Sequence, residues 1–427
     1  MKSNALSFIR LGDIADFRNG LNFSKESHGK GCPLIGVGDF KDNFSPKWDE
    51  LEEINPDGVS KVEDYLKEGD LLFVRSNGNK ALVGRSLYIN KDIKALYSGF
   101  CIRARLKTDD ICPLFLAYFT KTQFFRDAIS FVAGTNINNL NQGILSEVRI
   151  PSYSKEKQAL IVKSLSSIDK KIELNNRINA ELEAMAKTLY DYWFVQFDFP
   201  DANGDPYKAS GGKMVYNPVL KREIPEGWVA KPLSKITSVS KQTVKPTDYP
   251  DKVFRHFSIP VYDATKTYGL EAGGTIGSNK FTNKESDILV SKLNPWFSRV
   301  IYAMEEKELI CSTEFVVWRT SSSGIKNYLY MVAQSPQFIT HCTQAATGTS
   351  NSHKRVNPSV MMGFELPFND DVAISLGEKL EPMIKQKIIN QRENTELAKL
   401  RDWLLPMLMN GQVTVKPSTE SQEAQHG

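Results

Sequence analysis

The stretch SKEKQALIVKSLSSIDKKIELNNRINAELEAMAKTLYDYWF (154–194) decides the fold of this chain. Its apolar residues recur in alternating steps of four and three, the heptad spacing of a helix that buries one narrow stripe against another helix. Two asparagines interrupt the stripe at its centre. We predict a long helix here, with Ser154 as its N-cap. The stripe consists of Ile161, Leu165, Ile168, Ile172, Asn175, Asn179, Leu182, Ala186, Leu189 and Trp193.

The same stripe occurs a second time near the C-terminus. A constant shift of 215 positions, as from Ile161 to Leu376, carries every stripe position across. Away from the stripe, Arg177 matches Arg392 by the same shift. The second stripe consists of Leu376, Leu380, Met383, Lys387, Asn390, Asn394, Leu397, Arg401, Leu404 and Leu408. A constant shift over this length predicts an internal repeat.

The two copies are natural partners, because neither can bury its stripe alone. Asparagines in such a stripe cost stability but specify one register, since an amide opposite leucine loses its hydrogen bonds. Lys387 and Arg401 replace apolar residues of the first copy, so we expect frayed or asymmetric pairing there. Alternatively, each helix packs into its own domain and the repeat is a relic of duplication. We assign the pairing to Leu165, Ile168, Ile172, Asn175, Asn179, Leu182, Leu189, Leu380, Met383, Asn390, Asn394, Leu397 and Leu404.

The bulk composition is that of a globular protein with two or three domains. The net charge of +4 is a small difference between large counts and does not by itself indicate a nucleic-acid-binding protein. The cysteines are scattered, which indicates buried thiols in a reducing compartment. We expect no metal site, because no His, Cys and carboxylate cluster has ligand spacing. No apolar run spans a membrane and no signal segment is evident, so we expect a cytoplasmic protein.

A block of mixed strands and helices precedes each long helix. GDLLFVRSNGN (69–79) predicts a strand followed by a polar loop, and SDILVSKLNPWFSRV (286–300) matches it in the second block. A helix predicted at 113–131 corresponds to residues 327–342. The Gly- and Pro-rich residues 201–228 predict a linker. Few strand signals occur between 240 and 285.

In this order, these features resemble the specificity (S) subunits of type I restriction–modification systems, over essentially the whole chain. The resemblance rests on the duplicated block and helix, the Gly-Thr turns at 134–135 and 348–349 with the later Pro151 and Pro367, and the FDFPDANGDPYKASGGKM…IPEGW segment. It implies an α/β (α+β) fold with two globular target recognition domains separated by a pair of long antiparallel coiled-coil helices, related by a pseudo-two-fold repeat. The expected divisions are a first recognition domain at 1–150, a central spacer helix at 151–199, a linker at 200–225, a second recognition domain at 226–366, a distal spacer helix at 367–412 and a disordered tail at 413–427.

The resemblance also implies the function. Each recognition domain would read one half of a split site in double-stranded DNA, and the helices would dock two methyltransferase (M) subunits. This chain would be non-catalytic and bind no cofactor, because S-adenosylmethionine would be held by the partner methyltransferase. Cleavage would need a third, ATP-driven restriction (R) subunit, whose presence the sequence leaves open.

Loops with basic and amide side chains are the best candidates for DNA contacts, because such groups reach phosphates and base edges. Two stretches favour this interpretation: no acidic residue lies between Asp70 and Asp92 or between Glu314 and Glu365. Asparagine often caps turns instead. Arg103 and Arg105 alternate on a strand and could equally form a structural pair. The DNA-binding candidates are Arg75, Asn77, Asn79, Lys80, Asn136, Asn138, Lys292, Asn294, Arg299, Asn351, His353, Lys354 and Arg355.

Enzymatic functions receive little support. The Asn294-Pro295-Trp296-Phe297 stretch is similar to the Asn-Pro-Pro-Tyr/Phe loop of adenine methyltransferases, but it lacks the second proline and a glycine-rich cofactor loop. There is no P-loop motif. Two alternatives remain open: a coiled-coil adaptor whose end domains bind proteins and read no DNA, and a methyltransferase in its own right.

Overall fold

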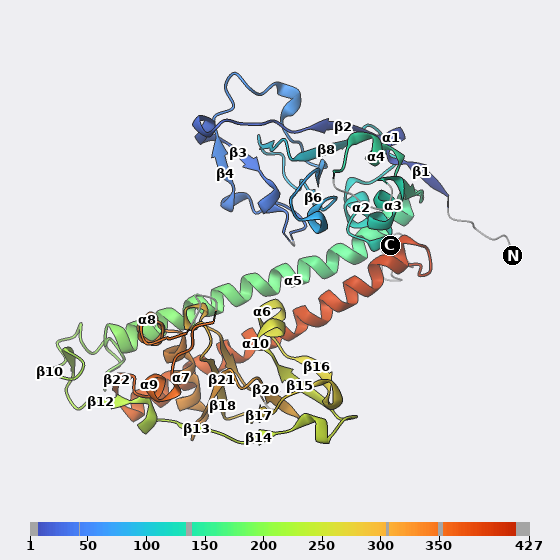
Figure 1. The fold of residues 1–427 in the computed structure, drawn as a ribbon. Helices are drawn as coiled ribbons and strands as arrows, with labels where there is room; N and C mark the ends of the chain where they lie inside the picture. Colours follow the sequence, from blue (N-terminus) through green and yellow to red (C-terminus); the bar gives the residue numbers. More distant parts are fainter. Residues whose placement is uncertain (1–6, 42, 134–138, 305–306, 349–352, 416–427) are drawn as a thin grey trace, which may run out of the picture. The chain divides into compact units, whose positions relative to one another are not determined.

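The computed structural model describes residues 7–41, 43–133, 139–304, 307–348 and 353–415. The chain divides into two compact units (Figure 1). Unit 1 comprises residues 1–170 and 397–427, and unit 2 comprises residues 171–396. Each unit therefore contains one block together with part of both long helices. The predicted fold class is confirmed: mixed helices and sheets accompany two long helices.

The first long helix, α5, spans Lys155–Tyr190 and continues as a π-helical turn over Asp191–Val195. The Ser154 hydroxyl accepts a hydrogen bond from the Lys157 amide at 3.4 Å, which places the helix start where the sequence predicts it. The second long helix, α10, spans Asp370–Met409.

Within unit 2 the two helices are antiparallel and joined by amides. The side chain of Asn175 donates to Asn394 at 2.9 Å, and that of Asn390 donates to Asn179 at 2.9 Å. When the position on α5 advances by four residues, from Asn175 to Asn179, its partner on α10 moves back by four residues, from Asn394 to Asn390. This arrangement excludes the alternative in which the helices pack only into separate domains. Of the thirteen residues assigned to pairing, none is exposed.

The helices are not frayed at Lys387 and Arg401; the pairing is asymmetric there, the other outcome that the sequence predicted, because these cations occupy the positions of Ile172 and Ala186 in the first copy. The Lys387 amine lies 2.8 Å from the Glu183 carboxylate in unit 2. The Arg401 guanidinium lies 3.0 Å from the Asp169 carboxylate in unit 1. In each case a carboxylate on α5 faces the cation, so the pairing continues through ion pairs where apolar contacts are missing.

In unit 1, an antiparallel sheet has the order β2-β8-β5-β6, and a smaller sheet has the order β4-β3-β7. The helix predicted at 113–131 is interrupted: α2 ends at Phe119, and α3 begins at Gln123, where the Thr122 hydroxyl accepts from the Phe125 amide. The elements of this block are β1 (Phe8–Arg10), α1 (Leu11–Ile14), β2 (Ala15–Asn19), β3 (His28–Ile35), β4 (Glu52–Ile54), β5 (Leu71–Val74), β6 (Ser86–Tyr88), β7 (Leu96–Tyr97), β8 (Cys101–Leu106), α2 (Pro113–Phe119), α3 (Gln123–Ala133), α4 (Gln142–Glu147) and β9 (Arg149–Pro151).

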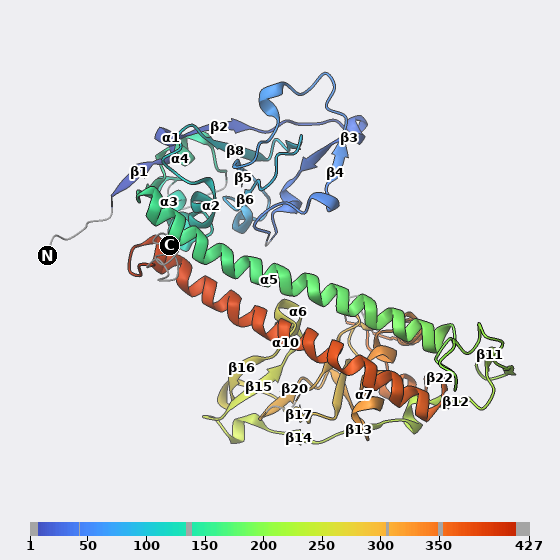
Figure 2. The same ribbon diagram turned by 180° about the vertical axis from the view of Figure 1, so that it is seen from behind.

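Unit 2 repeats this plan. Its sheet of order β13-β21-β18-β19 has the connectivity of β2-β8-β5-β6, and α7 lies beside α10 (Figure 2). Its elements are β12 (Val229–Pro232), β13 (Ser238–Ser240), β14 (Thr243–Val244), β15 (Val253–Phe257), α6 (Ile259–Thr265), β16 (Gly269–Ala272), β17 (Lys280–Thr282), β18 (Asp287–Ser291), β19 (Val300–Tyr302), β20 (Leu309–Cys311), β21 (Phe315–Arg319), α7 (Ser323–Gln334), α8 (Pro336–Gln344), α9 (Pro358–Met362) and β22 (Glu365–Phe368).

A buried ion pair marks the same place in both blocks. Asp70, at the start of β5, lies 2.6 Å from Arg105 on β8. Asp287, at the start of β18, lies 2.8 Å from Arg319 on β21. Both aspartates are fully buried, and each also accepts a backbone amide three residues earlier at 2.8 Å. Arg105 therefore has a structural role, which is one of the two possibilities that the sequence left open.

Two segments are more ordered than the sequence predicts. The supposed linker 200–225 contains a hairpin of β10 (Met214–Asn217) and β11 (Arg222–Pro225). Ile224 in this hairpin is buried in the core of unit 2, because a cluster of Phe199, Tyr207 and Trp228 closes the segment on itself. Residues 240–285 form β14 to β17 and α6. The predicted tail lies outside the described residues from 416 onward.

Candidate nucleic-acid interface

In unit 2 the fold brings together two of the predicted DNA-contacting loops. The loop after β18 and the segment after α8 are joined through backbone and side-chain hydrogen bonds. The Asn294 amide donates to the Lys354 carbonyl at 2.7 Å, and the Asn294 side chain accepts from the Lys354 amide at 3.0 Å. The Lys292 carbonyl accepts from Val356 at 3.0 Å. Residues 60 positions apart or more in sequence thus form one surface.

The same contact occurs in unit 1. The Arg75 carbonyl, after β5, accepts from the Leu140 amide at 2.8 Å. Arg75 is half-buried, and its guanidinium makes no ion pair with a described residue. Both blocks therefore join the loop after the central strand to the segment before the long helix by the same backbone contact, as the internal repeat predicts.

Two of the candidates in unit 2 are engaged in ion pairs. The Arg299 guanidinium binds Asp263 through two contacts of 2.7 and 2.8 Å and stacks on Phe297. The Arg355 guanidinium binds Glu314 through contacts of 2.9 and 3.1 Å. The hydrogen bond with Glu314 raises the pKa of Arg355, so this pair stays charged. Glu314 immediately precedes the stretch without acidic residues, and the fold brings its carboxylate into contact with Arg355 in that stretch.

Other candidates shape the loops. Asn77 accepts from the Asn79 amide at 2.8 Å, and Asn79 accepts from Ala81 at 3.0 Å, which are the turn-capping roles that asparagine often takes. Lys80 and His353 are exposed, and Lys354 is half-buried. Asn136, Asn138 and Asn351 lie outside the described residues. Contact with DNA stays a prediction for all these residues.

Sequence reasoning missed an aromatic pair at the tip of the loop after β18. Trp296 and Phe297 are 38% and 58% exposed, with ring centroids 5.9 Å apart. Their turn is bounded by Asn294 and Ser298, both with left-handed backbone conformations. Large exposed aromatic side chains beside Lys292 and Lys354 suit stacking on nucleic-acid bases. Exposure, which decides this role, cannot be read from the sequence.

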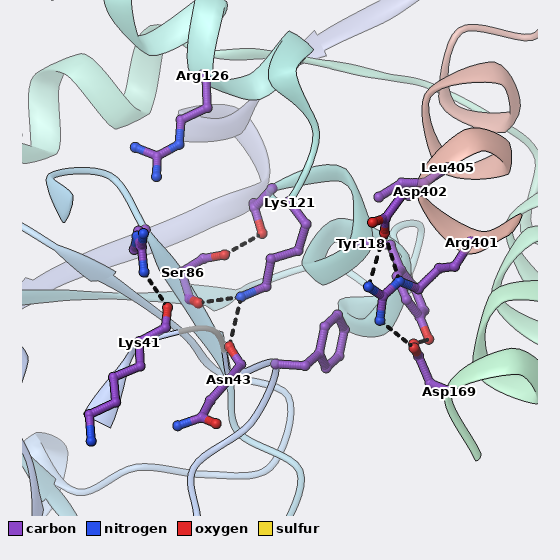
Figure 3. A pocket seen from close by; sticks show the side chains of 13 residues that line it. Lys41, Asn43, Ser86, Tyr118, Lys121, Arg126, Asp169, Arg401, Asp402 and Leu405 are labelled. Carbon is purple, nitrogen blue, oxygen red and sulfur yellow. Dashed lines mark hydrogen bonds and ion pairs between the residues drawn. The ribbon is translucent and has the colours of Figure 1, made fainter. Parts of the chain in front are cut away.

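A second group that the sequence did not indicate lies in unit 1. Lys41 comes from one segment and Lys121 and Arg126 from another, and all three line one cavity (Figure 3). Lys121 donates to the backbone carbonyls of Asn43 and Ser86 at 3.1 and 2.6 Å. The contacts come from residues more than 30 positions apart, so no local pattern could have revealed them.

The described part of the chain offers no group of three or more His, Cys, Asp or Glu side chains that could hold a metal ion. Among the same residues, no helix is both long enough and apolar enough to cross a membrane. The site is thus made of cations, amides and aromatic rings, which suit recognition of a polyanion that carries bases.

Comparison with known proteins defines the class first. Residues 6–184 match the family described as the type I restriction modification DNA specificity domain. The matched residues comprise the first block and most of α5.

Two relatives match over most of their length. The type I restriction enzyme MjaIX specificity subunit of Methanocaldococcus jannaschii is 24% identical over 322 residues, covering 72% of this chain and 71% of the relative. The HindI specificity subunit of Haemophilus influenzae is 22% identical, covering 83% of this chain and 90% of the relative. Over most of its length this chain is therefore similar to type I restriction–modification specificity subunits, and residues 6–184 match the family of their DNA specificity domain.

A solved structure supports the fold. The crystal structure of the type I restriction–modification S subunit from M. genitalium matches with a TM-score of 0.61 at 13% identity, covering 96% of this chain and 98% of that one. At this identity the match bears on the fold alone.

Proposed function

We propose that this specificity subunit reads a split site in double-stranded DNA, one half through each block. The observation that carries the proposal is the repeated loop contact, Arg75 with Leu140 in one block and Lys292 with Val356 in the other. Loops positioned by a rigid sheet are well suited to base readout. The contacts to phosphates supply affinity, which should fall as salt rises.

The outer faces of the long helices are proposed to dock two methyltransferase subunits. Exposed apolar residues recur with the 215-residue shift: Leu174 matches Ile389, and Met185 matches Leu400. These four side chains are between 38% and 54% exposed and lie off the paired stripe. In each helix the two positions are about three turns apart and share one face. A surface that is repeated but not used within the chain suits two copies of one partner.

The chain is proposed to have no catalytic activity of its own. Methylation would use S-adenosylmethionine held by the partner methyltransferase, and cleavage would use an ATP-dependent restriction subunit where the system has one. The Asn294–Phe297 turn supports this assignment, because the Asn294 side chain accepts from the Lys354 amide of its own block.

Mapping methylated adenines genome-wide tests the proposal. The map is made in cells that express the cognate methyltransferase with and without this chain. We expect a new motif of two short specific halves around a fixed gap. A chain carrying Leu174→Glu and Met185→Glu should lose methylation while remaining folded, whereas Lys61→Ala serves as a surface control.

No new methylation from an active methyltransferase and a folded chain would contradict the proposal. Retention of protein partners that is insensitive to salt would then favour the adaptor. Crosslinking of S-adenosylmethionine to the purified chain would instead favour a methyltransferase.

A further inference from the structure

Unit 1 contains a cavity of about 350 Å³ between its block and its portion of the long helices (Figure 3). Five cationic side chains line it: Lys41, Arg85, Lys121, Arg126 and Arg401. The carboxylates in its described lining are Asp169 and Asp402. The distribution of these charges decides what the cavity can bind.

Both carboxylates are held by Arg401. Its guanidinium donates to Asp169 and to Asp402, each at 3.0 Å. The second oxygen of Asp169 accepts from the Tyr118 hydroxyl at 2.6 Å. Figure 3 shows these residues as one hydrogen-bonded cluster. One guanidinium offsets only one of these two carboxylate charges, but the five cations of the described lining outnumber its two carboxylates, so the lining is cationic overall.

Arg126 lies in this remaining part. Its guanidinium donates to the Val83 carbonyl at 2.6 Å and pairs with no carboxylate among the described residues. Burial lowers the pKa of Arg126, and the charge of Arg85 lowers it further. Lys41 is exposed, and its amine makes no hydrogen bond with a described residue. Figure 3 shows the Lys41 amine and the Arg126 guanidinium at different places along the lining, and a hollow lined mainly by charges of one sign favours the binding of anions.

A neighbouring hollow of about 420 Å³ shares Lys41 and Arg85 with this cavity and extends to Asn77. Asn77 belongs to the loop predicted to read bases in the first block. The cationic lining thus runs from that loop toward the helices, the path that a nucleic-acid backbone would follow beside a base contact.

We propose that this cavity of unit 1 binds the DNA backbone next to the first half-site, with Lys41 and Arg126 each donating to a phosphate group. Guanidinium and ammonium groups form charge-assisted hydrogen bonds with phosphate oxygens. The inference rests on the proposed function and adds residues that the sequence did not indicate.

The corresponding position in unit 2 cannot bind an anion in this way. The 215-residue shift places Ile384 and Ala186 where unit 1 has Asp169 and Arg401. Met331 and Gln334 of unit 2 lie where Tyr118 and Lys121 lie in unit 1, as judged from the matching helix caps Thr122 and Ser335. Only about 20 Å³ of space remains there. The phosphate contact should therefore belong to the first block alone.

Salt-dependent DNA binding tests the inference. The full chain is assembled with its methyltransferase and titrated with two duplexes, one carrying the mapped motif and one unrelated. Lys41→Gln and Arg126→Gln should each lower the slope of log affinity against log salt by about one. Each should weaken both duplexes by a similar factor of about ten, the effect of one charge-assisted hydrogen bond. Arg126→Lys should restore much of the loss.

Lys61→Ala, an exposed cation that does not line the cavity, should leave the slope unchanged. Lys41→Gln keeps the test decisive if Arg126→Gln disturbs the loop, because the Lys41 amine makes no hydrogen bond with any residue that the structure describes. Unchanged slopes and affinities in both variants would overturn the inference. Binding of inorganic phosphate or pyrophosphate that depends on both residues, with DNA affinity unchanged, would assign the cavity to a free anion instead. Failure of the wild-type assembly to bind any duplex would count against the proposed function itself.

Discussion

The two units place different chemistry at the same position, where the block meets the long helices. Unit 1 has the cluster of Tyr118, Asp169 and Arg401 beside a cationic cavity. Unit 2 fills the position with Met331, Ile384 and Ala186. The buried pairs of Asp70 with Arg105 and Asp287 with Arg319 are nevertheless the same in both. The duplicated framework is thus fixed by buried polar pairs, while the junction has been free to acquire separate roles.

The largest expected effect concerns what the units share. Asp70→Ala and Asp287→Ala should each destabilise their own unit by about 3–5 kcal/mol, because each leaves a partly buried arginine without its carboxylate. Urea unfolding followed by hydrogen exchange in each unit measures this. Asp251→Ala, at an exposed position, is the control. A loss below about 1 kcal/mol in either unit would contradict the prediction that the two ion pairs stabilise their units to a similar extent.

A pH effect should distinguish the units. Burial lowers the pKa of Lys326 in α7 to about 7, although Glu285, Asp287 and Glu381 oppose this shift and Lys385 adds to it. Unfolded lysine has a pKa near 10.4, so between pH 7 and 9 the unfolded state binds more protons than the folded state. The stability of unit 2 should therefore rise with pH in this window, by about 2 kcal/mol.

Lys326→Met provides the control for that measurement. This variant should remove the rise in the stability of unit 2 with pH. The stability of unit 1 should not change, because the matching position in unit 1 is Pro113, which does not titrate. Unfolding free energies of each unit at pH 7 and pH 9, measured by hydrogen exchange, test this. A wild-type stability of unit 2 that is flat or falls over this window would contradict the buried amine.

The amide pair of unit 2 should show coupling. Asn179→Leu alone leaves the Asn390 amide without its partner, and it should cost about 1–3 kcal/mol. The double variant Asn179→Leu with Asn390→Leu should recover most of that cost, since leucine then faces leucine. A double-mutant cycle by urea unfolding measures the coupling. Additive losses would mean that the two amides do not act as a pair.

The smallest expected effect comes from exchanging the junction. Tyr118→Met, Asp169→Ile and Arg401→Ala together copy unit 2 into unit 1, and the stability of unit 1 should change by less than about 1 kcal/mol, because a partly buried polar cluster and apolar contacts of similar size are close in free energy. Each single variant should be less stable than the triple variant. Thermal unfolding compares all four variants with wild type. A large loss in the triple variant would show that the cluster is essential to the fold of unit 1.

The parts of the fold that the sequence predicts are those with a regular period. The heptad spacing and the 215-residue shift predict both helices, because each residue type recurs at a fixed interval. Strands β14 to β17 and the β10–β11 hairpin were missed, since short strands with polar faces resemble turns in the sequence.

The candidate site was predictable only in outline. The loops after β5 and β18 were identified from basic and amide residues that follow an apolar strand. The ion pairs of Arg299 with Asp263 and Arg355 with Glu314 join residues 36 and 41 positions apart, and no local pattern reveals them. The cationic cavity is assembled from separate segments and depends entirely on the fold.

The asparagine hydrogen bonds between α5 and α10 have a consequence for a chain that contains only one block and one helix. The repeat makes Asn175 equivalent to Asn390 and Asn179 equivalent to Asn394. Each of the two hydrogen bonds therefore joins the first asparagine of one helix to the second asparagine of the other. Two copies of either helix alone could form the same two bonds, which is the property of a self-complementary, isologous interface. A half-length chain with one block and one helix could therefore dimerise with itself, and its two identical blocks would then read a symmetric palindrome.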